Sequence, residues 1–542
     1  MLCVALGAFA MVAIMARDAP AQQQLAKLLA SDGEKLDGFG FSVAISGDLA
    51  LVGAWGDDAA APDSGSAYVF DVATAEQKWK LVASDAQPGD RFGFSVALSG
   101  QRAIVGARSA DAAGEHSGAA YIFDADTGQE LFKLAPASLA AHDGFGFSVA
   151  VSGQRAVLGA PWYDGLVADS GAAWLFDAAT GQELFQLLAW DWPPGEGFGQ
   201  SVAISGERVV VGAPGADVPG NNAGAAYVFD ATTGFGLFKL IPSDLAPLDA
   251  FGWSVAASDG VALVGAKFHA PHGAAYLFDL ATGQELFELS PPDVNAAYSF
   301  GEAVALSDGR AVVGDLGADG PSSVTGAAYV FDVATGQFLY ELTALDGSLG
   351  DFFGDSVAIS GARALIGARG DDDNGDDSGS AYLFAVPQSA GSAYCFGDGS
   401  GTTCACGNNA GPGQGCANST GAGAILWAAG SASASADELV LYADNLIPGQ
   451  AALAFAALNA VHDGDGWPLS DGLRCAGGGA VRLGISVPGP DATGIWGAGL
   501  AEQTGVSPGD LRRFQVWYRD PSGGPCGTGA NLTNGLEITF TP

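Results

Sequence analysis

The dipeptide Phe-Gly recurs at a nearly constant interval through about two thirds of the chain. Successive copies are 53 residues apart in five cases and 49 residues apart in one. Self-similarity at a fixed period of this size is the signature of a repeat architecture, in which each unit buries its apolar face against its neighbours. The fold of this region must therefore satisfy the repeat. The seven copies begin at Phe39, Phe92, Phe145, Phe198, Phe251, Phe300 and Phe353.

Each unit contains four short runs of β type. An apolar run such as 42–45 follows Phe-Gly, and a second run ends in Gly-Ala, or in Gly314-Asp315 in the sixth unit. The third run reads Gly-Ala-Ala-Tyr-Val-Phe-Asp at 224–230, and a turn such as 177–181 leads to the fourth run at 184–187. Four-stranded units at a period of about 50 residues are typical of β-propellers. The sequence therefore predicts an all-β chain with a seven-bladed propeller.

The two ends of the repeat complement each other. Residues 24–29 have the pattern of a fourth run, whereas the seventh unit stops after its third run at 381–384. We predict that this N-terminal strand completes the last blade, since pairing the two chain ends removes the open edge of the sheet. Deletion of residues 22–31 should then destabilise the whole ring.

The Phe-Gly and Gly-Ala-Pro landmarks, the latter complete at 159–161 and 212–214, resemble the FG-GAP repeat. That repeat builds the seven-bladed propeller of integrin α subunits and of many exported bacterial proteins. The resemblance covers about 24–386 and implies the fold more narrowly than the function, because propellers carry adhesion, scaffolding and catalysis alike. Residues 121–131 are also similar to the repeat of quinone-dependent dehydrogenases, but Phe replaces the usual docking Trp in most units.

The resemblance further implies calcium in acidic loops between the second and third strands. Loop 371–379 is the best match, with five acids in seven residues that would repel one another without a counterion. Two of its acids fit a calcium-loop pattern, although a glycine takes the third ligand place. A solvated acidic turn is the alternative. The predicted ligands of a structural calcium ion are Asp371, Asp373, Gly375 and Asp377 in blade seven, and Asp57, Asp58 and Asp63 in blade one.

Charge and hydropathy narrow the class of partner. The chain has 21 Lys and Arg against 60 Asp and Glu, a net charge of -39, which argues against nucleic acid and anionic membranes as partners.

Residues 2–16 form an uncharged apolar run before Ala19-Pro20-Ala21, so we predict a signal peptide over 1–21, with an N-terminal anchor as the alternative. No later stretch approaches a membrane span. We expect a monomer that is secreted or displayed at the cell surface.

Cysteine separates the chain into two parts. Apart from Cys3, every cysteine lies in the last part of the chain, and six there predict three disulfides with 15 possible pairings. A zinc site is the rival, but the tight pair 404–406 lacks the CxxC spacing. We expect a propeller over 22–387 and a disulfide-stapled all-β, sandwich-like domain over 388–542, similar to a module at the C-terminal ends of large exported bacterial proteins. The six are Cys395, Cys404, Cys406, Cys416, Cys475 and Cys526.

Catalytic residues cannot be assembled from the spacing. The serine after Phe-Gly recurs in six units, so it is interpreted as structural, and His269-x-x-His272 has no acid near it in the sequence. We predict a non-enzymatic binding or adhesion protein whose propeller loops, supported by calcium, bind an extracellular protein or glycan. The alternatives are a hydrolase or quinone-dependent dehydrogenase that uses Lys267, His269 and His272 of the shortened blade five, and a structural surface component.

Overall fold

A computed structural model describes most of the chain. Described are residues 23–541, apart from 166, 192–194, 218–219, 293–298, 319–324, 387–390, 398–401, 411–413, 430–431, 436–438, 490–491, 498 and 522–526. The predicted signal peptide, the boundary between 387 and 388, and Cys526 lie outside the described residues. No helix in the described part is both long and apolar enough to cross a membrane.

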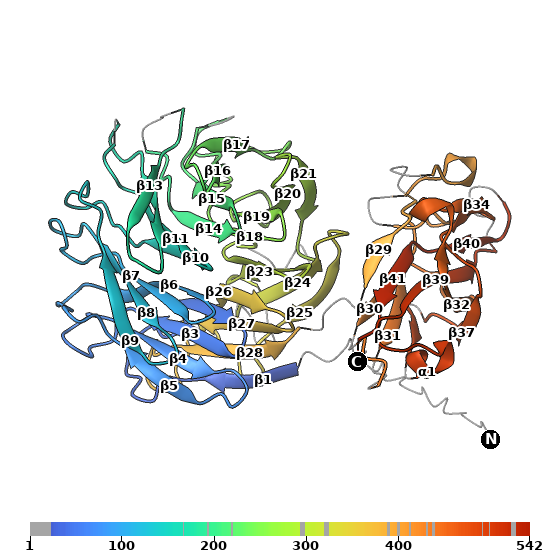
Figure 1. The fold of residues 1–542 in the computed structure, drawn as a ribbon, viewed down its shortest axis with the longest axis horizontal. Helices are drawn as coiled ribbons and strands as arrows, with labels where there is room; N and C mark the ends of the chain where they lie inside the picture. Colours follow the sequence, from blue (N-terminus) through green and yellow to red (C-terminus); the bar gives the residue numbers. More distant parts are fainter. Residues whose placement is uncertain are drawn as a thin grey trace, which may run out of the picture.

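The repeat folds into seven four-stranded antiparallel sheets within the described residues (Figure 1). The first strand of each sheet lines a central channel and the fourth lies outermost. In this order the blades are: one, β2 (Ser42–Ser46), β3 (Leu49–Ala54), β4 (Ser66–Asp71), β5 (Gln77–Leu81); two, β6 (Phe92–Ser99), β7 (Arg102–Ala107), β8 (Ala119–Asp124), β9 (Gln129–Leu134); three, β10 (Ser148–Ser152), β11 (Arg155–Ala160), β12 (Ala172–Asp177), β13 (Glu183–Leu187); four, β14 (Ser201–Ser205), β15 (Arg208–Ala213), β16 (Ala225–Asp230), β17 (Gly236–Leu240); five, β18 (Val255–Ser258), β19 (Val261–Ala266), β20 (Ala274–Asp279), β21 (Glu285–Leu289); six, β22 (Val304–Ser307), β23 (Arg310–Asp315), β24 (Ala327–Asp332), β25 (Phe338–Leu342); seven, β26 (Phe353–Ser360), β27 (Arg363–Ala368), β28 (Ser380–Ala385), completed by β1 (Gln23–Leu28).

The Phe-Gly landmark joins each blade to the one before it. The ring of Phe92 is fully buried and lies edge-on to Tyr121 of its own blade, with ring centroids 5.5 Å apart. Its backbone N–H donates to the carbonyl of Ser64 in blade one. The next residue, Gly93, has a φ of 90°, and a Cβ there would lie 2.1 Å from the carbonyl oxygen of Ser66. Only glycine fits this approach, which explains why the dipeptide is repeated.

The recurring serines also bridge neighbouring blades. The hydroxyl of Ser95 donates to the carbonyl of Gly146 at 2.7 Å, and Ser148, Ser201, Ser254 and Ser356 repeat this contact with the next blade. Ser42 accepts instead from the backbone N–H of Val96. The interpretation of these serines as structural is therefore confirmed.

The ring closes as the sequence predicts. β1 pairs antiparallel with β28, with Ala26 opposite Leu383 and Leu28 opposite Ala381. Figure 1 shows this N-terminal strand beside the last strand of the repeat. Leu28 is buried among side chains of blades one and seven, so closure adds apolar burial as well as backbone hydrogen bonds.

The C-terminal part is a second all-β unit. Its larger sheet runs in the order β29 (Ser392–Tyr394), β41 (Gly535–Thr539), β39 (Leu511–Arg519), β32 (Ala452–Ala457) and β37 (Val481–Ser486), and β40 (Ala530–Leu532) also pairs with β39. A second sheet contains β30 (Ile425–Ala429), β31 (Val440–Asp444) and β38 (Gly494–Trp496). Both contribute to one apolar core, which a short helix, α1 (Leu500–Thr504), also joins. Smaller elements are β33 (Asn459–Ala460) with β36 (Ala476–Gly477), β34 (Trp467–Leu469) with β35 (Gly472–Arg474), and 3₁₀ turns at Ala405–Gly407 and His462–Gly464.

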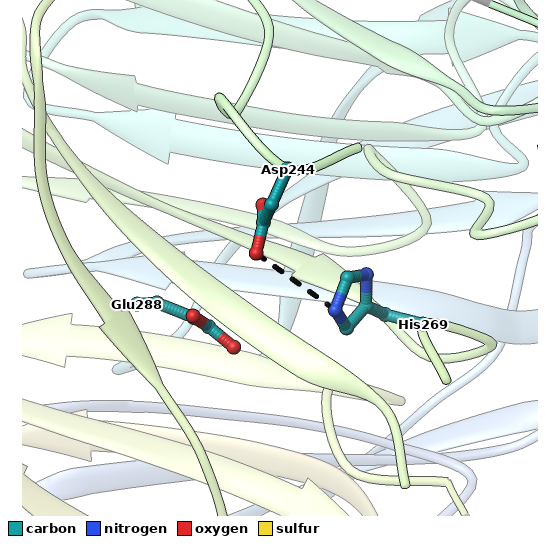
Figure 2. A group of neighbouring side chains, drawn as sticks. All are labelled: Asp244, His269 and Glu288. Atoms are coloured by element: carbon teal, nitrogen blue, oxygen red, sulfur yellow. Dashed lines mark ion pairs between the residues drawn. The ribbon is translucent and has the colours of Figure 1, made fainter. Parts of the chain in front are cut away.

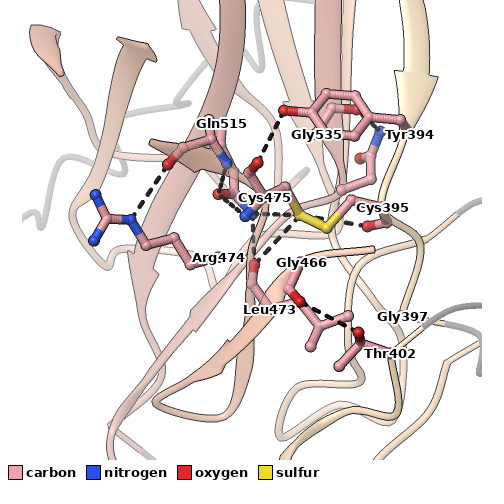
Figure 3. Close-up of a disulfide and its surroundings, with 12 residues drawn as sticks. Tyr394, Cys395, Gly397, Thr402, Gly466, Leu473, Arg474, Cys475, Gln515 and Gly535 are labelled. Carbon is pink, nitrogen blue, oxygen red and sulfur yellow. Dashed lines mark hydrogen bonds between the residues drawn. A yellow bond between two sulfur atoms is a disulfide. The ribbon is translucent and has the colours of Figure 1, made fainter. Parts of the chain in front are cut away.

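Two disulfides staple this unit. They join Cys395 to Cys475 and Cys404 to Cys416. Figure 3 shows the first, where the backbone N–H of Cys475 donates to the side chain of Gln515 and the hydroxyl of Tyr394 donates to the carbonyl of Cys475. The third predicted disulfide stays a prediction, because Cys526 and the side chain of Cys406 lie outside what is described. Disulfides are typical of proteins in oxidising compartments.

Candidate functional site

Two sets of loops meet on one face of the propeller, called here the loop face. The connector that enters a blade and the loop between its second and third strands lie at the same sheet edge. Gly56 of one such loop donates to Asp37 of the connector into blade one, and Leu36 of that connector donates to Asp376 in the loop of blade seven. Loops on a rigid scaffold are the usual place for recognition, so the candidate site is sought here.

The channel opens on the loop face through a mouth that touches every blade. The cavity at this mouth has a volume of about 610 Å³. The strands below it repeat closely, whereas the residue after each Phe-Gly differs around the ring. These residues are Phe41, Phe94, Phe147, Gln200, Trp253, Glu302 and Asp355, in blades one to seven. The repeat is therefore broken where a ligand would meet it.

One side of the mouth is aromatic. The ring of Phe94 lies 4.9 Å from that of Phe41 and 5.1 Å from that of Phe147, between centroids. The guanidinium of Arg108 lies 4.1 Å from the centroid of Phe94, and Trp162 packs edge-on against Phe147. An arginine over aromatic faces forms cation–π contacts that keep its charge while covering its planar surface.

The other side of the mouth is charged. Lys267 lies 3.0 Å from the carboxylate of Glu302 and 3.3 Å from the centroid of the Trp253 ring. Arg369 pairs with Asp355 at 3.1 Å. Burial raises the pKa of Asp355 to about 6, and the opposing charge of Arg369 does not cancel this effect. The mouth thus offers an apolar surface and a charged surface to one ligand.

A side pocket of about 480 Å³ extends the aromatic side of the mouth. Arg91, Arg108, His116, His142 and Trp162 line it, together with Asp63 and Asp169. Neither arginine forms an ion pair within the described part of the chain, although acids outnumber bases almost threefold overall. The Nε of Arg108 is buried without a hydrogen-bond partner there. Burial, and then the charge of Arg91, lower the pKa of Arg108 to about 10, which an anion in the pocket would reverse.

The predicted calcium ligands of blade seven divide into two groups. Asp371 and Asp373 come together, but around the ammonium of Lys27, at 2.9 and 2.6 Å. Asp371 also accepts from the hydroxyl of Tyr382 at 2.8 Å. Asp377 turns away, and its backbone N–H donates to the side chain of Asp372. Gly375 has a φ of 133° in the turn between them.

Blade one repeats this arrangement. Asp57 accepts from Lys80 at 2.8 Å and from the hydroxyl of Tyr68 at 2.6 Å. The side chain of Asp58 accepts the backbone N–H of Asp63, which has a φ of 51°. In both loops a lysine ammonium therefore lies where the inner carboxylate could meet a metal ion. The calcium prediction stays a prediction, and the structure gives the ion a specific competitor.

The rival enzyme site is not assembled by blade five. Lys267 faces the channel mouth, whereas His269 lies by the connector into its own blade, with Nδ1 2.8 Å from Asp249. His272 shares no described contact with either side chain. The three residues that interrupt the repeat in sequence do not form one cluster.

The fold defines a class of protein, a closed seven-bladed β-propeller. The chain belongs to the FG-GAP repeat family, which matches more than half of it and confirms the resemblance seen in the sequence. A comparison with curated proteins gives no match. The matched residues are 23–70, 76–123, 129–176, 183–229, 237–278, 284–331 and 339–384.

Proposed function

We propose that this chain is an extracellular, non-enzymatic binding protein whose loop face holds a protein or glycan partner over the channel mouth. The observation that carries the proposal is that the repeat loses its regularity at the mouth. The strands of the seven blades have similar sequences, whereas the residues at the channel mouth vary from blade to blade. A purely structural ring would have no need of five different residue types at that position. The disulfides and the family both support an extracellular setting.

The partner's chemistry follows from the two arginines of the side pocket, neither of which forms an ion pair within the described residues. Arg91 and Arg108 face one pocket beside Trp162 in a chain of net charge -39. A guanidinium binds carboxylates in a bidentate manner, and a neighbouring aromatic ring offers an apolar face. We infer a partner that presents carboxylates next to flat apolar surfaces, as uronate-containing glycans and acidic protein segments do.

The charged side of the mouth supports binding over catalysis. Lys267 and Arg369 are each paired with an acid, and the serine hydroxyls there donate to the next blade. A nucleophile needs a free base within hydrogen-bond reach, and the described mouth residues offer no such pair. Calcium in the loops of blades one and seven is a separable part of the proposal.

Binding to immobilised oligogalacturonate, with neutral dextran as the reference, tests the proposal directly. The informative variant is Arg108→Met, which keeps the apolar stem over Phe94 and removes the charge. Arg155→Met is the matched control, because Arg155 is the first residue of β11, at the opposite sheet edge. We expect at least a tenfold loss of affinity for Arg108→Met and none for Arg155→Met.

A protein partner is tested with the same pair of variants, by cross-linking in extracellular extract. Equal losses in both variants would show that general charge, and not the mouth, governs binding. Binding of neither an acidic glycan nor a protein that depends on Arg108 would contradict the proposal.

A further inference from the structure

Four blades contain the same cluster of a tyrosine, an aspartate and a lysine. The tyrosine is on the third strand, the lysine is on the fourth, and the aspartate is in the connector that enters the blade. In blade four, the hydroxyl of Tyr227 and the ammonium of Lys239 both contact Asp191, at 2.8 and 2.5 Å. The other three clusters are Tyr68, Asp32 and Lys80; Tyr121, Asp85 and Lys133; and Tyr382, Asp346 and Lys27.

Blade five keeps the tyrosine and the aspartate but not the lysine. Tyr276 donates to Asp244 at 3.1 Å, whereas Glu288 occupies the position of the lysine on β21. The third residue after the second strand is His269 in blade five, where blades one and seven have Asp57 and Asp371. Blade five has therefore exchanged a cation for a carboxylate and gained an imidazole at the same place.

The three side chains converge on one point. Figure 2 shows Asp244, His269 and Glu288 facing a common space from the connector, the loop and β21. One ligand atom from each lies within 4.8 Å of the other two. The imidazole Nε2 is 3.9 Å from the carboxylate of Asp244.

A buried carboxylate orients the imidazole. Asp249, with 3% of its side chain exposed, lies 2.8 Å from Nδ1 of His269. When Nδ1 donates its proton to Asp249, Nε2 carries a free lone pair and points toward Asp244. This carboxylate–histidine arrangement is the one that fixes the tautomer of metal-bound histidines. Asp249 is therefore a positioning residue, and the ligands are the other three.

We propose that Asp244, His269 and Glu288 bind a divalent transition metal ion of the zinc class. Independent support comes from comparing blade five with the other blades, because four of them place a lysine ammonium at the equivalent point. No lysine or arginine contacts Asp244 or Glu288 within the described residues. A divalent ion would restore the missing positive charge in blade five.

The types of donor atom in the cluster determine which ion it suits. One imidazole nitrogen and two carboxylate oxygens suit zinc and its neighbours, whereas calcium takes oxygen ligands. In a tetrahedral site the donors would lie about 3.4 Å apart, so these atoms must draw together by up to about 1.4 Å. Asp244 and Glu288 are exposed, which leaves their side chains free to do so. The fourth position would stay open to water or to a partner.

Isothermal titration of the full-length, tag-free protein with Zn²⁺ tests the proposal. We expect saturable binding of one equivalent, and with Co²⁺ the visible absorption of a four-coordinate site. His269→Ala should weaken the binding at least tenfold. Asp249→Asn should weaken it by about 10- to 100-fold, as loss of an orienting carboxylate does.

Glu288→Lys is the decisive variant, since it recreates the lysine cluster that four blades already fold around. We expect it to retain the thermal transition and to lose the Zn²⁺ site. His462→Ala is the control, because His462 lies in the C-terminal unit, edge-on to Trp467. Equal Zn²⁺ affinity in the wild type and in Glu288→Lys would overturn the proposal, as would absence of saturable binding. Binding lost only in His462→Ala would place the ion elsewhere and also overturn it.

Discussion

The ammonium of Lys27 lies 2.9 Å from the carboxylate of Asp371, although 344 residues separate them in the chain. Lys27 is on β1, the first strand of the described chain, and Asp371 lies in the loop of the last blade. Burial alone would lower the pKa of Lys27, but the hydrogen bonds that it donates to Asp346, Asp373 and Asp371 raise this pKa well above its ordinary value. Charge and strand pairing therefore close the ring together.

Lys27→Met should destabilise the ring. Asp371 is almost fully buried, and loss of its cation would leave a buried carboxylate with less compensation. We expect a cost of about 1–3 kcal/mol in the free energy of unfolding, measured by urea denaturation. Lys35→Met is the control, because the pair of Lys35 with Asp376 is exposed and its loss should change the stability little.

The same closure predicts the effect of deleting β1. Removal of residues 23–28 should lower the melting temperature of the whole propeller, because it exposes the edge of β28 and the core around Leu28. An unchanged melting temperature would contradict closure by this strand.

Calcium and Lys27 should compete for the loop of blade seven. If the loop binds calcium, the ion must displace an ammonium that already contacts Asp371 and Asp373. We expect millimolar calcium to raise the melting temperature more in Lys27→Met than in the wild type, relative to EDTA. A ligand at a hundredfold excess over its Kd stabilises by about 2.7 kcal/mol.

The double variant Asp371→Ala/Asp373→Ala supplies the control for calcium and should show no shift. If neither the wild type nor Lys27→Met responds to calcium, the acidic loop is a lysine-neutralised turn and the calcium prediction is wrong.

The propeller could be predicted from the sequence because its landmarks have backbone causes. Phe92 must be buried between blades, and Gly93 must have no side chain where it meets Ser66. Such constraints act on every unit in the same way, so they leave a periodic trace. Four strand-like runs of the C-terminal part can also be read from the sequence, and each overlaps an observed strand; they are 438–442, 480–487, 513–518 and 537–540.

The ion clusters could not be predicted in the same way, because their members come from different segments. His269 has no acid near it in the sequence, yet Asp249 and Asp244 of the connector into its blade lie beside it. The prediction that no acid is near was wrong because the fold brings this connector, about 20 residues earlier in the chain, against the loop that contains the histidine. The sequence does contain one signal: when the repeat units are aligned, the position of Lys239 in blade four is occupied by Glu288 in blade five.

Glu196 should make the stability of the propeller depend on pH. It is buried, and burial, with the charge of Asp191 added, raises its pKa to about 7. A carboxyl with a raised pKa in the folded state contributes stability at low pH that is lost as the pH rises from about 4.5 to 7. The amide of the Glu196→Gln variant does not titrate, so the free energy of unfolding of this variant should match that of the wild type near pH 4.5. At pH 8 the free energy of unfolding of the variant should be higher by about 2–3 kcal/mol.

Urea unfolding at the two pH values measures this difference. Glu207→Gln, at an exposed turn, removes the same charge and should show no such pH-dependent gain. A gain at pH 8 that is shared by both variants would assign the effect to net charge.

Two glycines of blade three separate close packing from turn geometry. Gly159 is the last residue but one of the second strand, and a Cβ there would lie 2.0 Å from the carbonyl oxygen of Gly199 in the next blade. Gly159→Ala should therefore force the two blades apart, at a cost above about 3 kcal/mol. Gly153 lies in a turn with a φ of 58° and open space around it. Gly153→Ala should cost only about 1 kcal/mol. Similar costs for the two variants in thermal unfolding would contradict the role of glycine as an inter-blade contact.

The disulfides should stabilise the C-terminal unit and leave the propeller unchanged. The bond between Cys395 and Cys475 spans 80 residues, and that between Cys404 and Cys416 spans 12. Loop-closure entropy predicts losses of about 4 and 3 kcal/mol when each pair is replaced by alanine. Because no cysteine lies between residues 22 and 394, calorimetry should show the propeller transition at an unchanged temperature. The C-terminal transition should fall further in the Cys395→Ala/Cys475→Ala variant than in the Cys404→Ala/Cys416→Ala variant. A propeller transition that moves with either pair would mean that the two units unfold as one.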